Sequence, residues 1–185
     1  VTSTTDFIHN LPRRRLFAGQ VLSEFPKPVI AGVNGYAISV GSIVTTCCDL
    51  IVASEKAEWR LPQAALGIIP NHAGSARLAR WIGKGNAMKV ALGFPLKADE
   101  AHRLGLVQWL VPHQEFEERL GEIADKVASL PPLASRLVKE SMNRGYDAST
   151  IAEAGYMDLY RAMALSMTEE SHDRHDDWRK ARNKG

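Results

Sequence analysis

The chain has 185 residues, of which 45% are hydrophobic, 24% are charged and only 7% are aromatic. This length fits one compact domain, or one domain with an appended helical element, and it can bury about 70% of the unfolded surface without a disulfide or metal. The composition argues against disorder, collagen, a coiled coil or a membrane protein. A net charge of +2 does not require a polyanionic partner, so no nucleic acid is expected to bind.

The first part of the chain alternates helix and strand patterns. Pro12 opens a helix-like segment that Pro26 stops, and the β-branched run Val29–Val33 predicts a strand buried on both faces. The expected elements that follow are a turn at 34–35, a short helix at 39–48, strands at 50–53 and 57–61, a loop with short helical pieces at 62–74, two or three short helices before 105 and a last strand at 107–111. This order indicates an α/β fold with covered strands.

Beyond Pro112 the character of the sequence changes, because glycine nearly disappears and apolar residues recur at every third or fourth position. Helices are predicted at 116–130, 131–145, 150–167 and from 168 to the end. We therefore expect an α/β core over residues 1–112 and a helical region over residues 113–185.

The two cysteines, Cys47 and Cys48, are adjacent within an apolar stretch. Neighbouring cysteines rarely bridge, so we interpret them as buried thiols in a reducing, cytoplasmic setting. No secretory signal is visible at Val1–Asn10, and the lack of an initiator Met indicates that the true start lies upstream. The longest uncharged run, 28–48, contains too many polar and small residues for a membrane-spanning helix, so no membrane is expected.

Two segments carry candidate chemistry. Residues 34–42 form a turn followed by small residues that enter a helix, which exposes backbone N–H groups suited to an anion or oxyanion. Alternatively, the small residues only let this helix pack close to the sheet. Residues 61–74 gather Gln63, Asn71 and His72 beside apolar residues, as a pocket wall would. There His72 can transfer protons near neutral pH, and the two amides can orient substrate or water. Alternatively, Asn71 caps the next helix and His72 lies in solvent.

A third segment places His172, His175 and Asp176 at metal-competent helical spacing. The same helix has ion-pair spacing between Glu170 and Arg174, and its acids precede its basic residues as the helix dipole favours. A solvated helix face therefore explains this segment better, and no metal is expected.

Several blocks in order resemble the enoyl-CoA hydratase/isomerase (crotonase) family. The residues KPVIAGVNGYA at 27–37 resemble the family block K-P-V-I-A-A-V-N-G-x-A, and CDLIVA at 48–53 is similar to its C-D-[IL]-x-x-A strand. Residues 66–83 resemble L-G-[IL]-x-P…G-x-x-R-L…[IV]-G, and residues 98–107 resemble A-x-x-A-x-x-x-G-L-V. The resemblance runs from about residue 12 to the end of the chain.

The resemblance implies a crotonase-like α/β spiral of ββα turns, followed by C-terminal helices that build homotrimers and often hexamers. It also implies an acyl-CoA substrate, with coenzyme A as part of that substrate and no permanently bound cofactor. Two backbone N–H groups would hold an enolate-like intermediate, and one of them maps onto Val40. The same carry-over gives the substrate-binding residues Tyr36, Ile38, Gly41, Pro62, Leu66 and Pro70.

The departures from the family pattern concern the acid–base groups. Ile43 and Gln63 stand where hydratases of the family carry two glutamates, so the two-glutamate mechanism is not expected. Asn71 stands where some members place an aspartate, which leaves His72 as the strong base candidate of the loop. Nothing in Val1–Leu11 resembles the half spiral that precedes this region in the family.

Two functions follow from these residues. The first is an acyl-CoA enzyme in which Val40 polarises the thioester, His72 handles the proton, and Gln63 with Asn71 orients water or substrate. The second is a catalytically silent subunit that binds CoA thioesters or serves assembly. The loss of both glutamates motivates the second function.

Overall fold

A computed structural model describes residues 18–182 of the chain. These residues divide into two compact units, one of residues 18–25 and 29–124 and the other of residues 26–28 and 125–182. Each unit is described by itself. The predicted helix start at Pro12 lies outside the described residues, and the predicted boundary between residues 112 and 113 stays a prediction.

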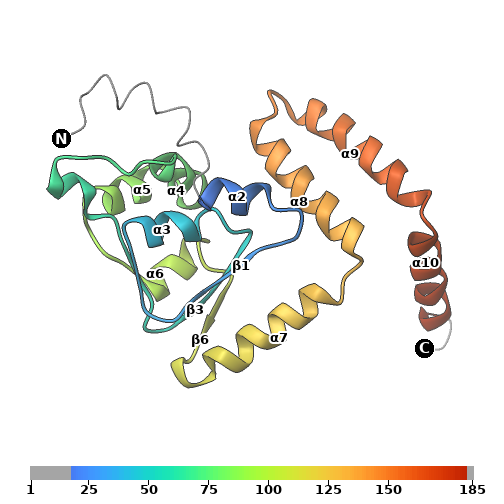
Figure 1. Cartoon of the computed structure of the whole chain (residues 1–185), viewed down its shortest axis with the longest axis horizontal. Helices are drawn as coiled ribbons and strands as arrows, with labels where there is room; N and C mark the ends of the chain where they lie inside the picture. Colours follow the sequence, from blue (N-terminus) through green and yellow to red (C-terminus); the bar gives the residue numbers. More distant parts are fainter. Residues whose placement is uncertain (1–17, 183–185) are drawn as a thin grey trace. The chain divides into compact units, whose positions relative to one another are not determined.

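The strands of the first unit form two three-stranded sheets (Figure 1). One sheet has the order β1-β3-β6 and is wholly parallel; in the other, of order β2-β4-β5, β4 pairs parallel with β2 and antiparallel with β5. The strands are β1 (Ile30–Val33), β2 (Tyr36–Ile38), β3 (Leu50–Ser54), β4 (Glu58–Arg60), β5 (Leu96–Lys97) and β6 (Trp109–Val111). One strand from each sheet, followed by a helix, makes up one turn of a spiral.

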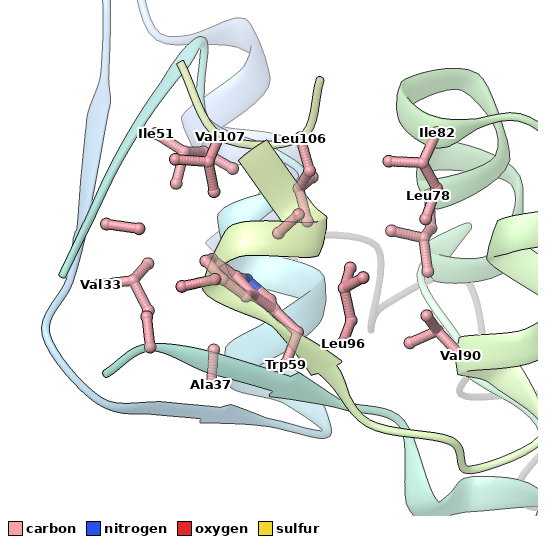
Figure 2. Packing of buried hydrophobic residues seen from close by; sticks show 14 of the residues in the cluster. Val33, Ala37, Ile51, Trp59, Leu78, Ile82, Val90, Leu96, Leu106 and Val107 are labelled. Carbon is pink, nitrogen blue, oxygen red and sulfur yellow. The ribbon is translucent and has the colours of Figure 1, made fainter. Parts of the chain in front are cut away.

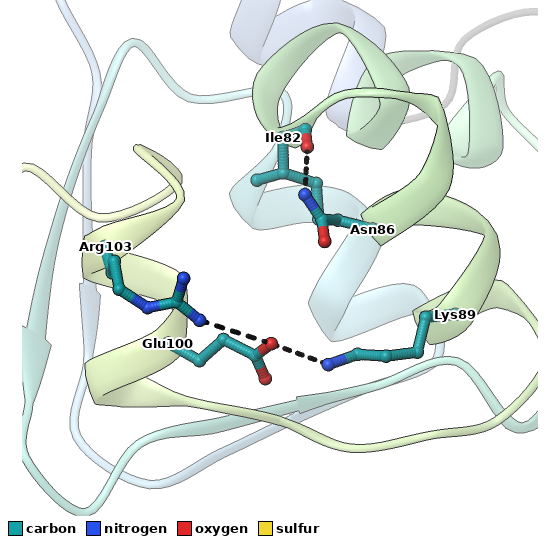
Figure 3. A network of polar contacts seen from close by, with 5 residues as sticks. All are labelled: Ile82, Asn86, Lys89, Glu100 and Arg103. Carbon is teal, nitrogen blue, oxygen red and sulfur yellow. Dashed lines mark hydrogen bonds and ion pairs between the residues drawn. The ribbon is translucent and has the colours of Figure 1, made fainter.

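Helices connect the strands of this unit. They are α2 (Ala18–Glu24), α3 (Val40–Thr45), the 3-10 helix η2 (Pro62–Leu66), α4 (Gly74–Ile82), α5 (Lys84–Ala91), α6 (Ala98–Arg103), η3 (His113–Glu115) and α7 (Phe116–Ala128), which continues into the second unit. A left-handed glycine, Gly83 at φ 78°, separates α4 from α5. Polar contacts then fix the helices: Glu100 accepts from Lys89 at 2.6 Å and pairs with Arg103, and Asn86 Nδ2 donates to the Ile82 carbonyl (Figure 3).

The register between β1 and β3 is fixed at its start by Asp49. Its carboxylate accepts from the Val29 N–H at 2.6 Å, and its own N–H donates to the Val29 carbonyl at 2.9 Å. On the other side of this sheet, Gly32 leaves room for α7, because a Cβ there would lie 2.7 Å from Leu120 Cδ2. Gly32 in β1 therefore lets α7 approach the sheet, and Asp49 before β3 fixes how β1 and β3 pair.

The core of this unit surrounds Trp59, whose indole lies among apolar side chains from both sheets and the helices (Figure 2). Trp59 is 1% exposed, and its Nε1 donates to Thr45 Oγ1 at 3.0 Å, which satisfies the polar end of a large buried ring. Its fully buried neighbours include Ile51, Leu61, Leu78, Val90, Leu96, Leu106 and Val107. The core thus combines apolar residues of the predicted strands with residues of the helices α4 and α5 and of the unpredicted strand β5.

Some predicted elements differ from the structure. The helix expected at 39–48 is only Val40–Thr45, because residues 46–48 close it with turns. The strand expected at 107–111 begins at Trp109, since Gln108 pairs with Ile51 through both its backbone and its side chain. β2 and β5 were not predicted.

The second unit contains α8 (Pro132–Asp147), α9 (Ile151–Ser166) and α10 (Glu169–Arg182), close to the predicted helices. α8 and α9 pack against each other, and Arg161 donates to Glu140 between them at 3.0 Å. At the start of α9, Thr150 Oγ1 accepts from the Glu153 N–H, as a capping box requires. Within residues 18–182, no helix is both long and apolar enough to cross a membrane.

We expect Asp49→Ala to lower the free energy of unfolding by about 1–3 kcal/mol, because the partly buried Val29 N–H loses its acceptor. Asp49→Asn keeps an acceptor oxygen and should lose less. Urea unfolding of the full chain measures both, with the exposed Asp173→Ala as a control. Equal stability of Asp49→Ala and the parent chain would contradict this role.

Candidate active site

The candidate site begins where β2 runs into α3. Along β2, Tyr36 and Ile38 are exposed on one face, while Ala37 between them enters the core. The Ser39 N–H then donates to the Arg60 carbonyl at 2.9 Å, which ends the pairing of β2 with β4. Two of the predicted substrate-binding side chains therefore share an open face beside the start of α3.

Val40 is the first residue of α3 and is 47% exposed. The first helical hydrogen bond runs from the Ile43 N–H to the Ser39 carbonyl. The N–H groups of Val40 and Gly41 lie in the first turn, where a helix provides no acceptor of its own. The backbone of Val40 is thus placed as a hydrogen-bond donor, as the sequence predicted, although its role in binding stays a prediction.

Ser39 has an unusual backbone, with φ 56° and ψ −116°. Such a positive φ suits glycine and is costly for a residue with a Cβ. The Ser39 side chain contacts the buried Gln63, whose Nε2 donates to Ser39 Oγ at 3.1 Å. Gln63 Oε1 is buried and has no hydrogen-bond partner among the described residues. The structure therefore joins Gln63 to the residue before Val40.

Ile43 is 1% exposed and packs against the loop that follows η2. A Cβ on Gly74 would lie 2.8 Å from Ile43 Cγ1 and 3.4 Å from Pro70 Cβ, so Ile43 and Pro70 both lie close to Gly74. Ile43 thus fills its position as a packing residue. Neither Ile43 nor Gln63 supplies a carboxylate at this site.

The loop from Gly67 to Ala73 holds the remaining candidates. Gly67, at φ 72°, ends η2, and Pro70 is buried. Asn71 and His72 are exposed, and His72 and Ala73 are consecutive left-handed residues at φ 53° and 60°. The alternative that Asn71 caps α4 is wrong, because Ala73 occupies the N-cap and only the Asn71 carbonyl takes part, accepting from the Gly74 N–H.

The predicted residues are therefore only partly brought together. A hydrogen bond joins Gln63 to Ser39, and Pro70 and Ile43 both lie close to Gly74, while the side chains of Asn71 and His72 lie on the exposed part of the loop. The other predicted substrate-binding residues range from the partly buried Pro62 to Leu66, which is 70% exposed.

One pair of charges at the site was missed by the sequence reasoning. The Arg60 guanidinium lies 5.3 Å from the centre of the Tyr36 ring and forms an ion pair with Glu58. The hydrogen bond and attraction from Glu58 raise the pKa of Arg60 above its usual value. This arrangement depends on the register of β2 and β4, which places Tyr36 opposite Glu58 and Ile38 opposite Arg60. A single sequence carries no signal for that register.

The histidines of α10 that were considered as metal ligands contact backbone carbonyls close to them in the sequence. His172 Nε2 lies 2.8 Å from the Ser166 carbonyl, and His175 Nδ1 lies 2.7 Å from the Ser171 carbonyl. In the part of the chain that the structure describes, no three His, Cys, Asp or Glu side chains are grouped so that they could hold a metal ion. Asp176 instead forms an ion pair with Arg179 of the same helix.

Known proteins share these features of sequence and fold. A sequence model of the enoyl-CoA hydratase/isomerase family matches residues 14–180. A probable mitochondrial enoyl-CoA hydratase of Dictyostelium discoideum is 42% identical over 127 residues, which are 68% of this chain and 46% of that protein. The short-chain-enoyl-CoA hydratase of Clostridium acetobutylicum is 42% identical over 120 residues, which are 64% of this chain and 46% of that protein.

The same agreement extends to three dimensions. The crystal structure of an enoyl-CoA hydratase from Bacillus anthracis superimposes with a TM-score of 0.88 at 30% identity, covering 97% of this chain and 69% of that one. The chain spans about half the length of the curated relatives it matches. The crotonase-like fold predicted from the sequence is confirmed, and the chain belongs to the enoyl-CoA hydratase/isomerase family.

Proposed function

We propose that this chain acts on an acyl-CoA thioester by a route other than hydration between two glutamates. The observation that carries this proposal is the state of the two glutamate positions. Ile43 is a buried packing residue against Gly74, and Gln63 is a buried amide held by Ser39. Neither group can take up a proton, so the reaction needs another base.

The backbone at Val40 supplies the electrostatic part of this function. Val40 is the first residue of α3, so its N–H has no acceptor within the helix and can donate to the oxygen of a bound thioester. Negative charge on that oxygen grows as an enolate-like intermediate forms, and a preorganised donor stabilises it more than the ground state. The exposed Tyr36 and Ile38 flank this position and would contact the acyl-CoA.

The proton-transfer part of the function falls to His72. Its side chain is exposed on the loop that Ile43 and Pro70 anchor, and imidazole is the side chain best suited to proton transfer near neutral pH. Asn71 and Gln63 would orient substrate or water. This set fits double-bond isomerisation, C–C bond hydrolysis or hydration with a different base.

We expect His72→Ala to lower the single-turnover rate on an acyl-CoA substrate by about 10²–10⁴-fold, the usual contribution of a general acid–base group. His175→Ala removes an exposed histidine from α10 and should leave the rate unchanged. Quench-flow on a panel of enoyl-CoA and ring-containing acyl-CoA thioesters measures the effect. Full activity in His72→Ala would remove His72 from the mechanism.

We expect Val40→Pro to lower the same rate by about 10²–10³-fold, because it deletes the donor N–H at a helix position where proline is otherwise tolerated. Val40→Ala keeps the amide and should lose far less. Thermal unfolding checks that both variants fold, since proline also restrains the preceding Ser39. Similar rates in both variants would show that the Val40 amide does not act on the substrate.

The loss of both glutamates also favours a second candidate, a catalytically silent subunit that binds CoA thioesters. The same thioester panel separates the two functions. A folded chain that binds acyl-CoA in calorimetry but turns over no member of the panel supports the silent subunit.

We also propose that the chain forms homotrimers or hexamers through its C-terminal helices. α9 and its C-cap Met167 carry an exposed apolar stripe, formed by Tyr156, Leu159, Tyr160, Met163 and Met167. These side chains are between 53% and 83% exposed, more apolar surface than one helix normally leaves in water. A second copy of the chain is the partner proposed for this stripe.

We expect the double variant Tyr160→Glu/Met163→Glu to shift the mass measured by light scattering from trimer or hexamer to monomer, because two charges would be buried at the interface. Asp173→Lys, on the polar helix α10, changes charge by as much without touching the stripe. A double variant that keeps the mass of the parent assembly would show that the stripe is not the interface.

A further inference from the structure

The outward face of the sheet β2-β4-β5 carries charged side chains that the proposed reaction does not use. Residues directly opposite each other on neighbouring strands point to the same face of a sheet. The register places Glu58 between Tyr36 of β2 and Lys97 of β5, and it places Arg60 opposite Ile38. The residue between Glu58 and Arg60 enters the core, so these two side chains point outward.

Arg60 is held by two contacts that leave the outer part of its guanidinium free. Its Nε donates to Glu58, and the guanidinium lies over the Tyr36 ring, 5.3 Å from the ring centre. Neither Nη atom has a hydrogen-bond partner among residues 18–182. A planar guanidinium with both Nη groups open can bind a carboxylate or a phosphate through two parallel hydrogen bonds.

The charges of the three strands favour an anion at this face. Glu58 is the one acidic residue of β2, β4 and β5, and its side chain is only 14% exposed, whereas that of Arg60 is 47% exposed. Lys97 is exposed on the other side of Glu58 and adds a second positive charge. A ligand that approaches from solvent therefore meets two cations, while the single carboxylate is largely covered.

Arg60 also lies close to the position proposed for the thioester. The Ser39 N–H donates to the Arg60 carbonyl at 2.9 Å, and the next residue is Val40, the proposed donor to the thioester oxygen. The guanidinium lies over Tyr36, which precedes Val40 by four residues, at most about 13 Å of extended chain. An acyl group that starts at Val40 and follows this face of β2 brings its far end to Arg60. The phosphates of CoA are separated from the thioester by the long pantetheine arm, so the acyl group is the nearer source of an anion.

We infer that Arg60 is a specificity-determining residue that binds a carboxylate at the far end of the acyl group, so that the substrate is the CoA thioester of a dicarboxylic acid. The carboxylate accepts from the two Nη groups of Arg60, and Lys97 adds electrostatic attraction. The inference rests on the proposed action on acyl-CoA thioesters and names the class of their acyl group.

Calorimetry of the full chain with pimeloyl-CoA and heptanoyl-CoA tests the inference, because their acyl groups have equal numbers of carbons and differ in one terminal carboxylate. The parent chain should bind pimeloyl-CoA about tenfold more tightly, as expected for hydrogen bonds between charged groups. Arg60→Gln should abolish this preference and leave the affinity for heptanoyl-CoA unchanged. Added salt should reduce the preference of the parent chain, because the site is open to solvent.

Two further variants separate the guanidinium from the charge around it. Glu58→Gln retains an oxygen that accepts from Arg60 Nε but removes the negative charge, so the preference for pimeloyl-CoA should increase. The double variant Glu58→Gln/Arg60→Gln leaves the net charge of the pair as it is in the parent chain, and it should still lose the preference. Arg103→Gln removes an exposed arginine of α6 and should bind both probes as the parent does. Thermal unfolding checks that each variant is folded.

Several results would overturn the inference. Equal affinities of the parent chain for the two probes would show that no carboxylate is recognised, although binding of both would keep the proposed function. If Arg60→Gln weakens both probes equally, Arg60 contacts the CoA part instead. If the double variant recovers the preference, the loss in Arg60→Gln is only repulsion by Glu58. A folded parent chain that binds neither probe would overturn the proposed function together with this inference, which distinguishes the two failures.

Discussion

One backbone hydrogen bond, from the Ser39 N–H to the Arg60 carbonyl, determines how the candidate site is assembled. It is the last bond between the parallel strands β2 and β4, and the chain leaves both strands at this point. One departure leads into α3 with Val40 at its first turn, and the other leads into η2 with Gln63 on it. Parallel pairing therefore places side by side two segments that are distant in the sequence, and the Ser39–Gln63 contact follows from this pairing.

The loss of the two carboxylates changes how the site is held together. A buried carboxylate needs charged or hydrogen-bonding partners to offset its desolvation, whereas Ile43 needs only close packing. Its contact with Gly74 anchors the start of α4 by shape, and the absent Cβ of Gly74 makes this approach possible. Gln63, at the second glutamate position, in contrast has an uncharged amide that can still form hydrogen bonds. Of the two former glutamate positions, the one on η2 thus keeps a polar side chain and the one on α3 holds an apolar one.

Patterns that are long or strongly apolar could be predicted from the sequence, and short or register-dependent features could not. The apolar runs of β1 and β3 and the amphipathic helices of the C-terminal region can be recognised from the sequence, although β1 is only partly buried and not buried on both faces as predicted. β2 and β5 have three and two residues, too few for an alternation to be seen. Gln63 was identified from the polar residues of segment 61–74 and from its place in a family motif, but its partner Ser39 was not, because that contact depends on how β2 pairs with β4. The position of Arg60 over Tyr36 has the same origin.

The loop that presents His72 shows how strain and packing are combined. His72 and Ala73 both have left-handed backbones without being glycine, which costs of order 1–3 kcal/mol each. Such a conformation persists only where its surroundings determine it, and here both ends of the turn are fixed. Pro70 is buried at one end, and at the other the Gly74 N–H donates to the Asn71 carbonyl and Gly74 lies close to Ile43. The packing of Ile43 therefore does more than replace a carboxylate, since it holds the strained turn on which the proposed base is carried.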